Sequence, residues 1–305
     1  MPTLALKVDV DTFRGTRHGV PRLIDLLRRH EAGATFLFSL GPDHTGRAIK
    51  RVFRKGFFGK VSRTSVVSHY GLRTLMYGTL LPGPDIGRRC RDILTATRDA
   101  GFETGIHCWD HVKWQDGVER ADSAWTEAQM QHAIDRYADI FDQAPKTHGA
   151  AGWQMNPHAL RLTQRQGFAY ASDCRGTHPF IPVCQGEIIL CPQIPTTLPT
   201  LDELIGLDGI TAENVHDHLL ALTATPKDHV YTLHAELEGM RLSNVFEKLL
   251  TGWRAQGYQL VALKGAAAQL NITTLPRCEI LRGEVSGRSG TLMVQGREFL
   301  DDYAN

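Results

Sequence analysis

The sequence predicts an α/β fold built around a parallel β-sheet, either closed as a barrel or open and doubly wound. Apolar segments typical of strands alternate with amphipathic segments typical of helices at least six times in the 305 residues. The first three segments follow the order strand, helix, strand, which favours a parallel pair with a right-handed crossover. Polar side chains recur where the predicted strands end, and parallel α/β folds carry their functional groups at this edge.

Hydrophobic periodicity assigns each element of this alternation. Short apolar runs predict strands over residues 4–10, 34–40, 102–106, 168–173, 187–194, 229–234 and 258–263. Apolar residues spaced by three and four positions predict helices over residues 19–30, 85–100, 123–141, 157–166, 214–224 and 242–256. Pro21 lies near the start of the first helix, and Ser123 with Glu127 marks the start of the third.

We expect one catalytic domain rather than two. It covers residues 1–263 and contains an insertion at residues 41–84 whose composition differs from that of its surroundings. Residues 264–305 form a C-terminal appendage, in which alternating residues around Gly283, Gly287 and Gly290 predict a small β-hairpin.

Composition is that of an ordinary globular protein, with 42% hydrophobic and 22% charged residues. A net charge of +1 provides no general attraction to nucleic acid, so we expect no nucleic-acid partner. No window approaches the ~18 apolar residues of a membrane span, and the first residues do not resemble a signal peptide. The six cysteines contain no C-x-x-C pair, which indicates reduced thiols in the cytoplasm.

The insertion has a strongly basic character. No acidic residue occurs between Asp43 and Asp85, and basic and apolar residues alternate at helical spacing over residues 47–58. A basic amphipathic segment with aromatic residues is typical of a membrane-surface element attracted to anionic head groups. A solvated basic face and a nucleic-acid contact remain alternatives. The residues expected to contact the membrane or a lipid phosphate are Arg47, Lys50, Arg51, Phe53, Arg54, Lys55, Phe57 and Phe58.

Several predicted strands end in side chains that can bind a metal or transfer a proton. His107 and His111 lie four residues apart after the third strand, and Asp9 and Asp11 share one face at the end of the first. Two histidines and one aspartate form a set suited to a divalent transition metal with open positions. A second aspartate and His234 could supply proton transfers, which points to metal-assisted hydrolysis of an amide or ester.

Together, these motifs resemble the polysaccharide deacetylase (NodB-homology) family. Asp9-Val10-Asp11 is similar to its paired-aspartate motif, His107 to His111 to its H-x-x-x-H motif, and Leu233-His234 to its late Leu-His motif. The order along the chain also matches, and the resemblance covers roughly residues 4–263. It implies a distorted (β/α) barrel and metal-dependent removal of N-acyl groups from amino sugars.

The resemblance also implies a role for each residue. Asp9 would be the general base and His234 the general acid. Asp11, His107 and His111 would hold one divalent cation, and zinc, cobalt and manganese all suit such a set.

One motif departs from the family pattern. Family members usually carry an Arg followed by Pro that braces the catalytic aspartate, and residues 148–153 contain neither. We expect Arg175 to take that role, and the neighbouring Asp173 to orient either Arg175 or His234.

Within the family, the basic insertion and the stretches Ser172–Gly176 and Leu233–Glu236 resemble the members that deformylate 4-deoxy-4-formamido-L-arabinose on undecaprenyl phosphate. This implies a polyprenyl-phosphate-linked sugar substrate, a place at the cytoplasmic face of the bacterial inner membrane, and a role in lipid A modification and resistance to cationic peptides. An N-deacetylase of another amino sugar and a catalytically silent sugar-lipid binding protein remain alternatives.

Overall fold

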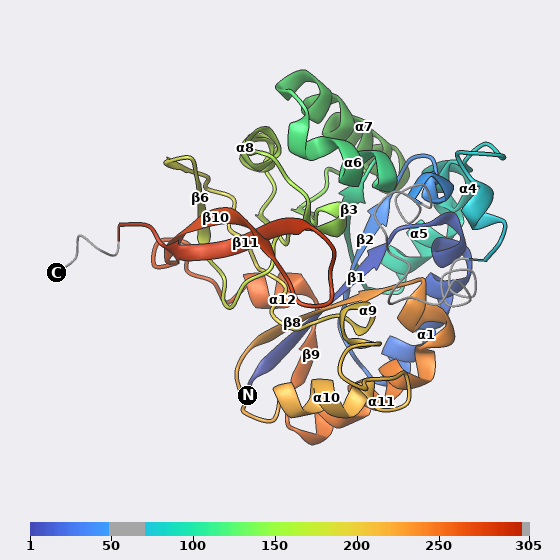
Figure 1. The fold of residues 1–305 in the computed structure, drawn as a ribbon, viewed down its shortest axis with the longest axis vertical. Helices are drawn as coiled ribbons and strands as arrows, with labels where there is room; N and C mark the ends of the chain where they lie inside the picture. Colours follow the sequence, from blue (N-terminus) through green and yellow to red (C-terminus); the bar gives the residue numbers. More distant parts are fainter. Residues whose placement is uncertain (49–70, 301–305) are drawn as a thin grey trace.

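A computed structural model describes residues 1–48 and 71–300. Its centre is a seven-stranded sheet in the order β5-β4-β3-β2-β1-β8, and β9 pairs with the beginning of β1 (Figure 1). All of these pairs are parallel. The strands are β1 (Thr3–Val10), β2 (Thr35–Ser39), β3 (Glu103–Cys108), β4 (Thr147–His148), β5 (Tyr170–Ala171), β8 (His229–His234) and β9 (Gln259–Val261).

Helices surround the outside of this sheet (Figure 1). They are α1 (Val20–Arg29), α4 (Ile86–Arg89), α5 (Arg91–Asp99), α6 (His111–Gly117), α7 (Ser123–Phe141), α8 (Pro157–Arg165), α9 (Leu201–Leu204), α10 (Val215–Leu222), α11 (Ser243–Ala255) and α12 (Leu263–Ala267). Short turns of other helix types are η1 (Gly15–Gly19), η3 (Thr74–Met76), η4 (Val118–Arg120), η5 (Ala151–Trp153) and η6 (Leu237–Arg241). In the described part of the chain, no helix has both the length and the apolar character needed to cross a bilayer.

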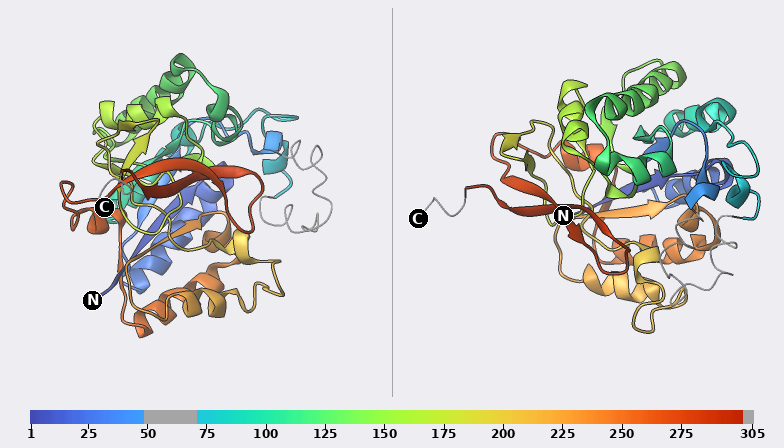
Figure 2. Two further views of the ribbon diagram at one scale, coloured as in Figure 1. Left: turned by 60° about the vertical axis from the view of Figure 1, so that its left-hand side comes forward. Right: turned by 45° about the horizontal axis from the view of Figure 1, so that its top comes forward.

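A second sheet of four strands, in the order β11-β10-β6-β7, packs beside the first (Figure 2). Its strands are β6 (Ile181–Cys184), β7 (Glu187–Ile188), β10 (Arg277–Glu284) and β11 (Thr291–Glu298). The predicted C-terminal hairpin therefore forms, but β10 also pairs in parallel with β6 from the middle of the chain. Cys278, Ile280 and Met293 of the hairpin are buried in the main core.

The seven-stranded sheet curls, and its two edges are connected by the irregular chain between β7 and α9. Ala171 of β5 exchanges backbone hydrogen bonds with Pro192 and Ile194 of this chain, at 2.9 and 2.8 Å. Further along, the Thr197 N–H donates to the carbonyl of Val230 in β8 at 3.1 Å. The expected barrel is thus closed on one side by a segment that is not a regular strand.

Some predicted boundaries are wrong for local reasons. The strand expected at residues 187–194 is restricted to β7, and beyond it Gln193 forms only isolated bridges, to Ala171 and Phe180. The helix expected at residues 85–100 is divided at Cys90 into α4 and α5. Asp122, rather than Ser123, caps α7, because its carboxylate accepts a hydrogen bond from the N–H of Trp125 at 2.8 Å.

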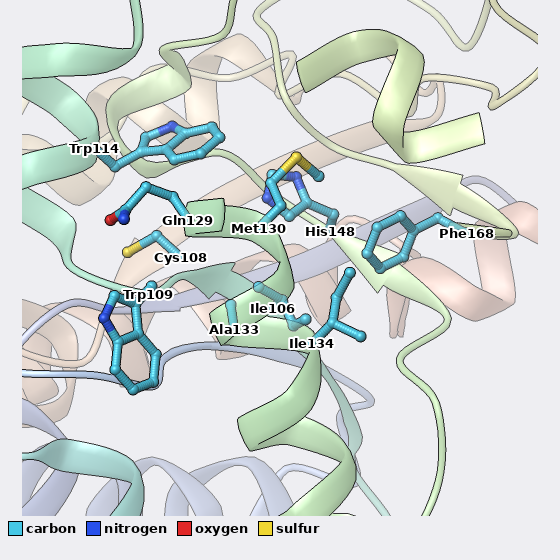
Figure 3. A pocket seen from close by; sticks show the side chains of 10 residues that line it. All are labelled: Ile106, Cys108, Trp109, Trp114, Gln129, Met130, Ala133, Ile134, His148 and Phe168. Carbon is cyan, nitrogen blue, oxygen red and sulfur yellow. The ribbon is translucent and has the colours of Figure 1, made fainter. Parts of the chain in front are cut away.

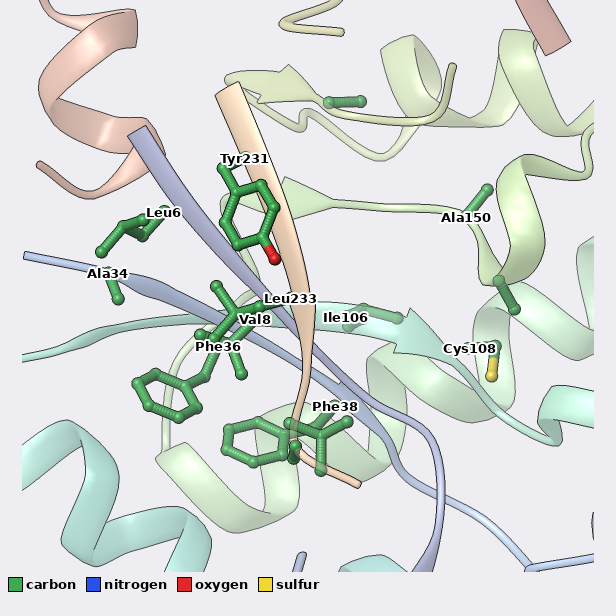
Figure 4. Close-up of a cluster of buried hydrophobic side chains, with 14 of the residues drawn as sticks. Leu6, Val8, Ala34, Phe36, Phe38, Ile106, Cys108, Ala150, Tyr231 and Leu233 are labelled. Atoms are coloured by element: carbon green, nitrogen blue, oxygen red, sulfur yellow. The ribbon is translucent and has the colours of Figure 1, made fainter. Parts of the chain in front are cut away.

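Strand alternation separates the packing face of the sheet from its interior face. Leu6 and Val8 of β1 lie with Phe36 and Phe38 of β2 in the main hydrophobic cluster, shown in Figure 4. Burial of each such side chain contributes about 1.5–3 kcal/mol. The intervening residues of β1 face the barrel interior. They include Lys7, which is fully buried and lies two residues before Asp9 of the candidate site.

The insertion expected at residues 41–84 lies only partly within the described residues. Arg47 is exposed, and its Nε donates to the carbonyl of Gly78 at 2.9 Å. Seven residues of the predicted membrane contact lie outside the described ranges: Lys50, Arg51, Phe53, Arg54, Lys55, Phe57 and Phe58. The six cysteines are all buried and free, in agreement with the expected reduced thiols.

Candidate metal centre and active site

The carboxyl ends of β1, β3 and β8 carry the predicted site residues to one edge of the sheet. Asp9 in β1 is in register with His234 in β8, so the expected base and acid occupy neighbouring strand ends. His107 is the penultimate residue of β3, and His111 is the first residue of α6. The turn between them is stabilised by Asp110, which caps α6 by accepting a hydrogen bond from the N–H of Lys113 at 3.1 Å.

Asp11, His107 and His111 form a compact group that could hold a metal ion. Asp11 Oδ1 lies 3.2 Å from Nε2 of His107, and its Oδ2 lies 3.5 Å from Nε2 of His111. The candidate ligand atoms all lie within 4.8 Å of one another. Oδ1 of Asp11 is buried and accepts no hydrogen bond from any described residue. A buried carboxylate oxygen that lacks a hydrogen-bond donor is stabilised if a cation binds at the centre of the group.

The tautomer of His107 also suits a ligand. Its Nδ1 lies 2.6 Å from the carbonyl oxygen of Gly149, and only a protonated nitrogen can donate to that oxygen. Nδ1 of the neutral ring therefore carries the proton, which leaves the lone pair of Nε2 directed toward Asp11. A backbone carbonyl that fixes the tautomer in this way is the usual support for a metal-binding histidine.

Asp173 holds the loop that carries this carbonyl. Its Oδ1 accepts hydrogen bonds from Nδ1 of His148 at 2.7 Å and from the Ala150 N–H at 2.9 Å. Its Oδ2 accepts one from Nε2 of Gln193 at 3.1 Å. The expectation that Asp173 orients His234 or Arg175 is therefore wrong. It supports the site indirectly, through the loop that orients His107.

Asp9 is buried beside a cation that the sequence reasoning missed. Its Oδ2 lies 3.4 Å from Nζ of Lys7, which also donates to the carbonyl of Ser172 at 3.1 Å. The Lys7 ammonium lies 5.2 Å from the centre of the Trp153 ring. A lysine inside an otherwise apolar strand, two residues before Asp9, was the available signal for this pair.

Arg175 does not brace Asp9, contrary to expectation. Its Nη1 donates to both carboxylate oxygens of Glu203 at 2.6 and 2.8 Å, and its Nη2 donates to the carbonyl of Leu198 at 2.9 Å. The guanidinium also packs 5.1 Å from the centre of the Trp153 ring. Arg175 thus anchors α9, and Lys7 is the cation beside Asp9.

His234 lies among several carboxylates. Its backbone N–H donates to Glu238 at 2.9 Å, and its Nδ1 lies 3.8 Å from Oδ1 of Asp202. Burial alone would lower the pKa of His234, but the negative charges of Asp202, Asp11 and Glu238 outweigh it and raise the pKa to about 9. The imidazole is therefore protonated at neutral pH, as a proton donor requires.

Glu236 is a second residue whose role the sequence did not indicate. Its Oε1 accepts hydrogen bonds from the backbone N–H groups of Asp11 and Thr12, at 3.2 and 2.8 Å, and from the Thr12 hydroxyl at 2.8 Å. These bonds hold the chain where it leaves β1. Burial and the negative charge of Asp11 raise the pKa of Glu236 to about 8. For Asp11, burial acts in the same direction, but the His111 and His107 imidazoles outweigh it and lower the pKa.

The enclosed pocket in Figure 3 lies behind β3 and does not belong to this site. Ile106 and Cys108 line it together with residues of α7, so the intervening His107 faces the opposite side of the strand. His148 also faces this pocket, next to Trp114. Its lining is almost entirely apolar, as expected for a packing cavity under a helix.

Comparisons with known proteins agree with this arrangement. No family model matches the chain. A Shewanella sediminis (strain HAW-EB3) protein named "Probable 4-deoxy-4-formamido-L-arabinose-phosphoundecaprenol deformylase ArnD" is 38% identical over 96% of this chain and 94% of its own length. A protein of the same name from Wigglesworthia glossinidia brevipalpis is 32% identical over 92% of this chain and 98% of its own. This chain belongs to the ArnD deformylase family.

Solved structures show the same fold at much lower identity. One from Mycobacterium smegmatis, assigned as a polysaccharide deacetylase, has a TM-score of 0.62 at 16% identity and covers 93% of this chain and 96% of its own. The PuuE allantoinase has a TM-score of 0.60 at 14% identity, with coverage of 87% and 89%. The expected α/β fold of the NodB-homology type is thus confirmed, with its parallel sheet curled into a half-barrel.

Proposed function

We propose that this protein hydrolyses the formamide of 4-deoxy-4-formamido-L-arabinose carried on undecaprenyl phosphate, which yields the free 4-amino sugar and formate. The names of the two ArnD relatives support this substrate. The observation that carries the proposal is the gathering of Asp11, His107 and His111 at the strand edge that also carries Asp9 and His234. Oδ1 of Asp9 lies 3.7 Å from Nδ1 of His107, and Asp9 is in register with His234 on the neighbouring strand. This arrangement has the groups that hydrolysis of an amide requires.

Asp11, His107 and His111 would hold one divalent cation, and zinc, cobalt and manganese all suit two imidazoles and a carboxylate. Bound there, the cation would act as a Lewis acid toward the formyl oxygen and the attacking water. The buried and unpartnered Oδ1 of Asp11 supports its occupancy. The Nδ1–H of His107, held by Gly149, places the lone pair of the neutral ring on Nε2, the nitrogen that would bind the cation.

Two residues of the chain would move protons. Asp9 accepts a proton from the water whose oxygen forms a bond to the formyl carbon, and the Lys7 ammonium, 3.4 Å away, orients the Asp9 carboxylate. His234 donates its proton to the amide nitrogen as the carbon–nitrogen bond breaks, so that the sugar leaves as a neutral amine. The formic acid formed then loses its proton and departs as formate.

The enzyme would act as a peripheral protein at the cytoplasmic face of the bacterial inner membrane, because a polyprenyl chain remains in the bilayer. The basic residues of the insertion at 41–84 would attract anionic lipid head groups or the substrate phosphate. Arg47, the described member of that set, is exposed. In this proposal residues 1–263 form the catalytic domain, and its product contributes to lipid A modification and resistance to cationic peptides.

The decisive experiment is mass spectrometry of the lipid product after incubation with the purified protein and defined divalent metals. Loss of one CO unit together with formate release is expected, and Asp9→Asn should abolish both. An N-acetyl analogue of the sugar serves as the competing substrate. Preferred turnover of that analogue would make the protein a deacetylase, while binding without turnover under every metal condition would make it a silent binding protein.

A further inference from the structure

The loop between β10 and β11 reaches the functional site from the C-terminal end of the chain. Figures 1 and 2 show this red loop beside the yellow segment that carries α9. Gly287 has φ of +82°, and a Cβ there would overlap the carbonyl oxygen of Glu203 in α9. The backbone of the loop therefore lies directly against α9. Position 287 requires glycine because of its positive φ and because a Cβ would have no room.

This approach delivers Arg288 to the carboxylates next to His234. Nη1 of Arg288 lies 3.3 Å from Oε1 of Glu203 and 4.0 Å from Oδ2 of Asp202. Its guanidinium lies 4.7 Å from the centre of the Trp153 ring, and the side chain is only 19% exposed. A planar cation held over a ring and between two acids has few alternative positions.

Asp202 has its two oxygens directed to different partners. Oδ1 accepts a hydrogen bond from the Thr200 hydroxyl at 2.7 Å and faces Nδ1 of His234 at 3.8 Å. Oδ2 is the oxygen that faces Arg288. The Asp202 side chain is 44% exposed, so its carboxylate has room to turn into water. The cation on the Oδ2 side opposes that rotation.

Glu203, in contrast, has sufficient partners without Arg288. Both of its oxygens accept from Arg175, and Oε2 also accepts from the N–H of Thr200 at 3.0 Å. Arg175 is joined to β11 through backbone hydrogen bonds with Met293 and Gln295, at 2.9 and 2.8 Å. The two arginines thus have different tasks: Arg175 anchors the fold, and Arg288 is available to act on Asp202.

We propose that Arg288 is a positioning residue that holds the Asp202 carboxylate toward the His234 imidazole, so that the C-terminal hairpin is part of the active site. The proposal rests on the deformylase function, in which His234 donates a proton to the leaving nitrogen. If the His234 imidazole is misoriented, the chemical step slows, but the binding of the sugar and its lipid does not change. The C-terminal segment therefore contributes to turnover although it supplies no catalytic residue.

Arg288→Gln should lower kcat roughly tenfold and leave KM within about twofold, measured by formate release from the metal-loaded enzyme. Arg288→Lys should recover part of the loss, because it restores the charge without the planar fork. In an Asp202→Asn background, Arg288→Gln should cause no further loss, since both changes act on the same interaction. Arg297→Gln, which removes an exposed arginine paired with Glu279 on the same hairpin, should have no effect on kcat.

A second pair of variants tests the approach of the loop without removing its charge. Gly287→Ala should displace the loop from α9 and reduce kcat as Arg288→Gln does. Gly290→Ala is the matched control, because Gly290 has a similar φ of +77° but nothing within 4 Å of an added Cβ. Gly290→Ala should introduce backbone strain similar to that of Gly287→Ala but leave kcat unchanged.

A rise in KM with unchanged kcat in Arg288→Gln would overturn the proposal, because Arg288 would then contact the substrate. Independent, multiplicative losses in Arg288→Gln and Asp202→Asn would also overturn it. Absence of formate release by the wild-type protein would instead refute the proposed function. In that case an NMR titration decides whether Arg288 acts on His234: the His234 resonances should shift in Arg288→Gln but not in Arg297→Gln, and unchanged resonances would overturn the inference on its own.

Discussion

At the scale of single residues, the site combines three carboxylate environments. Asp11 faces two imidazoles, Asp9 faces the Lys7 ammonium, and Asp202 faces His234. Each carboxylate is thus matched to a different positive or proton-bearing partner. In the proposed mechanism these three aspartates would serve as metal ligand, general base and support for His234.

Substitution of the candidate ligands should remove the metal and the activity without unfolding the protein. His107→Ala and His111→Ala each leave two of three ligands, which is insufficient for tight binding of one divalent ion. Elemental analysis should find less than one metal per chain, and circular dichroism should remain that of the folded protein. Full metal content in either variant would contradict the assignment.

The Lys7–Asp9 pair makes a thermodynamic prediction. Both side chains are nearly inaccessible to solvent, so Lys7→Met leaves an uncompensated buried charge and should lower the free energy of unfolding by roughly 3 kcal/mol. Lys7→Met combined with Asp9→Asn should regain most of that loss, as measured by urea denaturation. Additive destabilisation in the double variant would show that the two groups do not interact.

The pKa of His234 predicts the alkaline limit of activity. Since its pKa is raised to about 9, the imidazole is protonated well below pH 9 and loses its proton as the pH rises through that value. The value of kcat should therefore fall as the pH rises through the pKa of His234. In Asp202→Asn the limit should move to lower pH, because a negative charge near Nδ1 is lost. A limit that does not move would exclude Asp202 as the cause.

At the scale of secondary-structure elements, strand ends and helix starts determine where the ligands lie. The six-residue strand β3 ends immediately before Trp109, and α6 begins at His111. Asp110 connects them and also accepts from Nδ1 of His44, at 2.6 Å. Asp110 thus caps the helix that begins with the candidate ligand His111, and it binds His44 at the start of the insertion to the same site.

Loss of this cap should affect both stability and metal binding. Asp110→Ala removes the cap of α6 and should cost about 1 kcal/mol, and it should weaken metal binding because His111 begins that helix. Asp122→Ala removes the equivalent cap of α7 and is the control. It should cost a similar amount in thermal unfolding, while the metal affinity measured by calorimetry stays unchanged.

At the scale of the whole molecule, the C-terminal hairpin belongs to the same folding unit as the barrel. Met293 of β11 is buried in the main core, while Leu281 of β10 is 45% exposed. Met293→Ala should therefore destabilise the entire protein by about 2–5 kcal/mol in a single transition, and Leu281→Ala by much less. Urea denaturation followed by tryptophan fluorescence distinguishes this from separate unfolding of an appendage.

Much of the fold was predictable because local pattern determines it. The eight residues of β1 and the nineteen of α7 carry an apolar pattern that only one regular structure can bury, and their predicted boundaries agree closely with the structure. The irregular chain between β7 and α9 was not predictable in this way. It is held by hydrogen bonds to β5 and β8, which lie far from it in sequence.

By itself, the sequence determined which residues meet at the candidate metal centre. Asp9, Asp11, His107 and His234 follow or end strands, and the carboxyl ends of parallel strands meet at one edge whatever the details of packing. Only the tertiary structure decided which charges accompany them. Lys7 is selected over Arg175 as the partner of Asp9, and Arg288 is brought to Asp202 across 86 positions of chain, because these contacts depend on how separate elements pack and have no local signature.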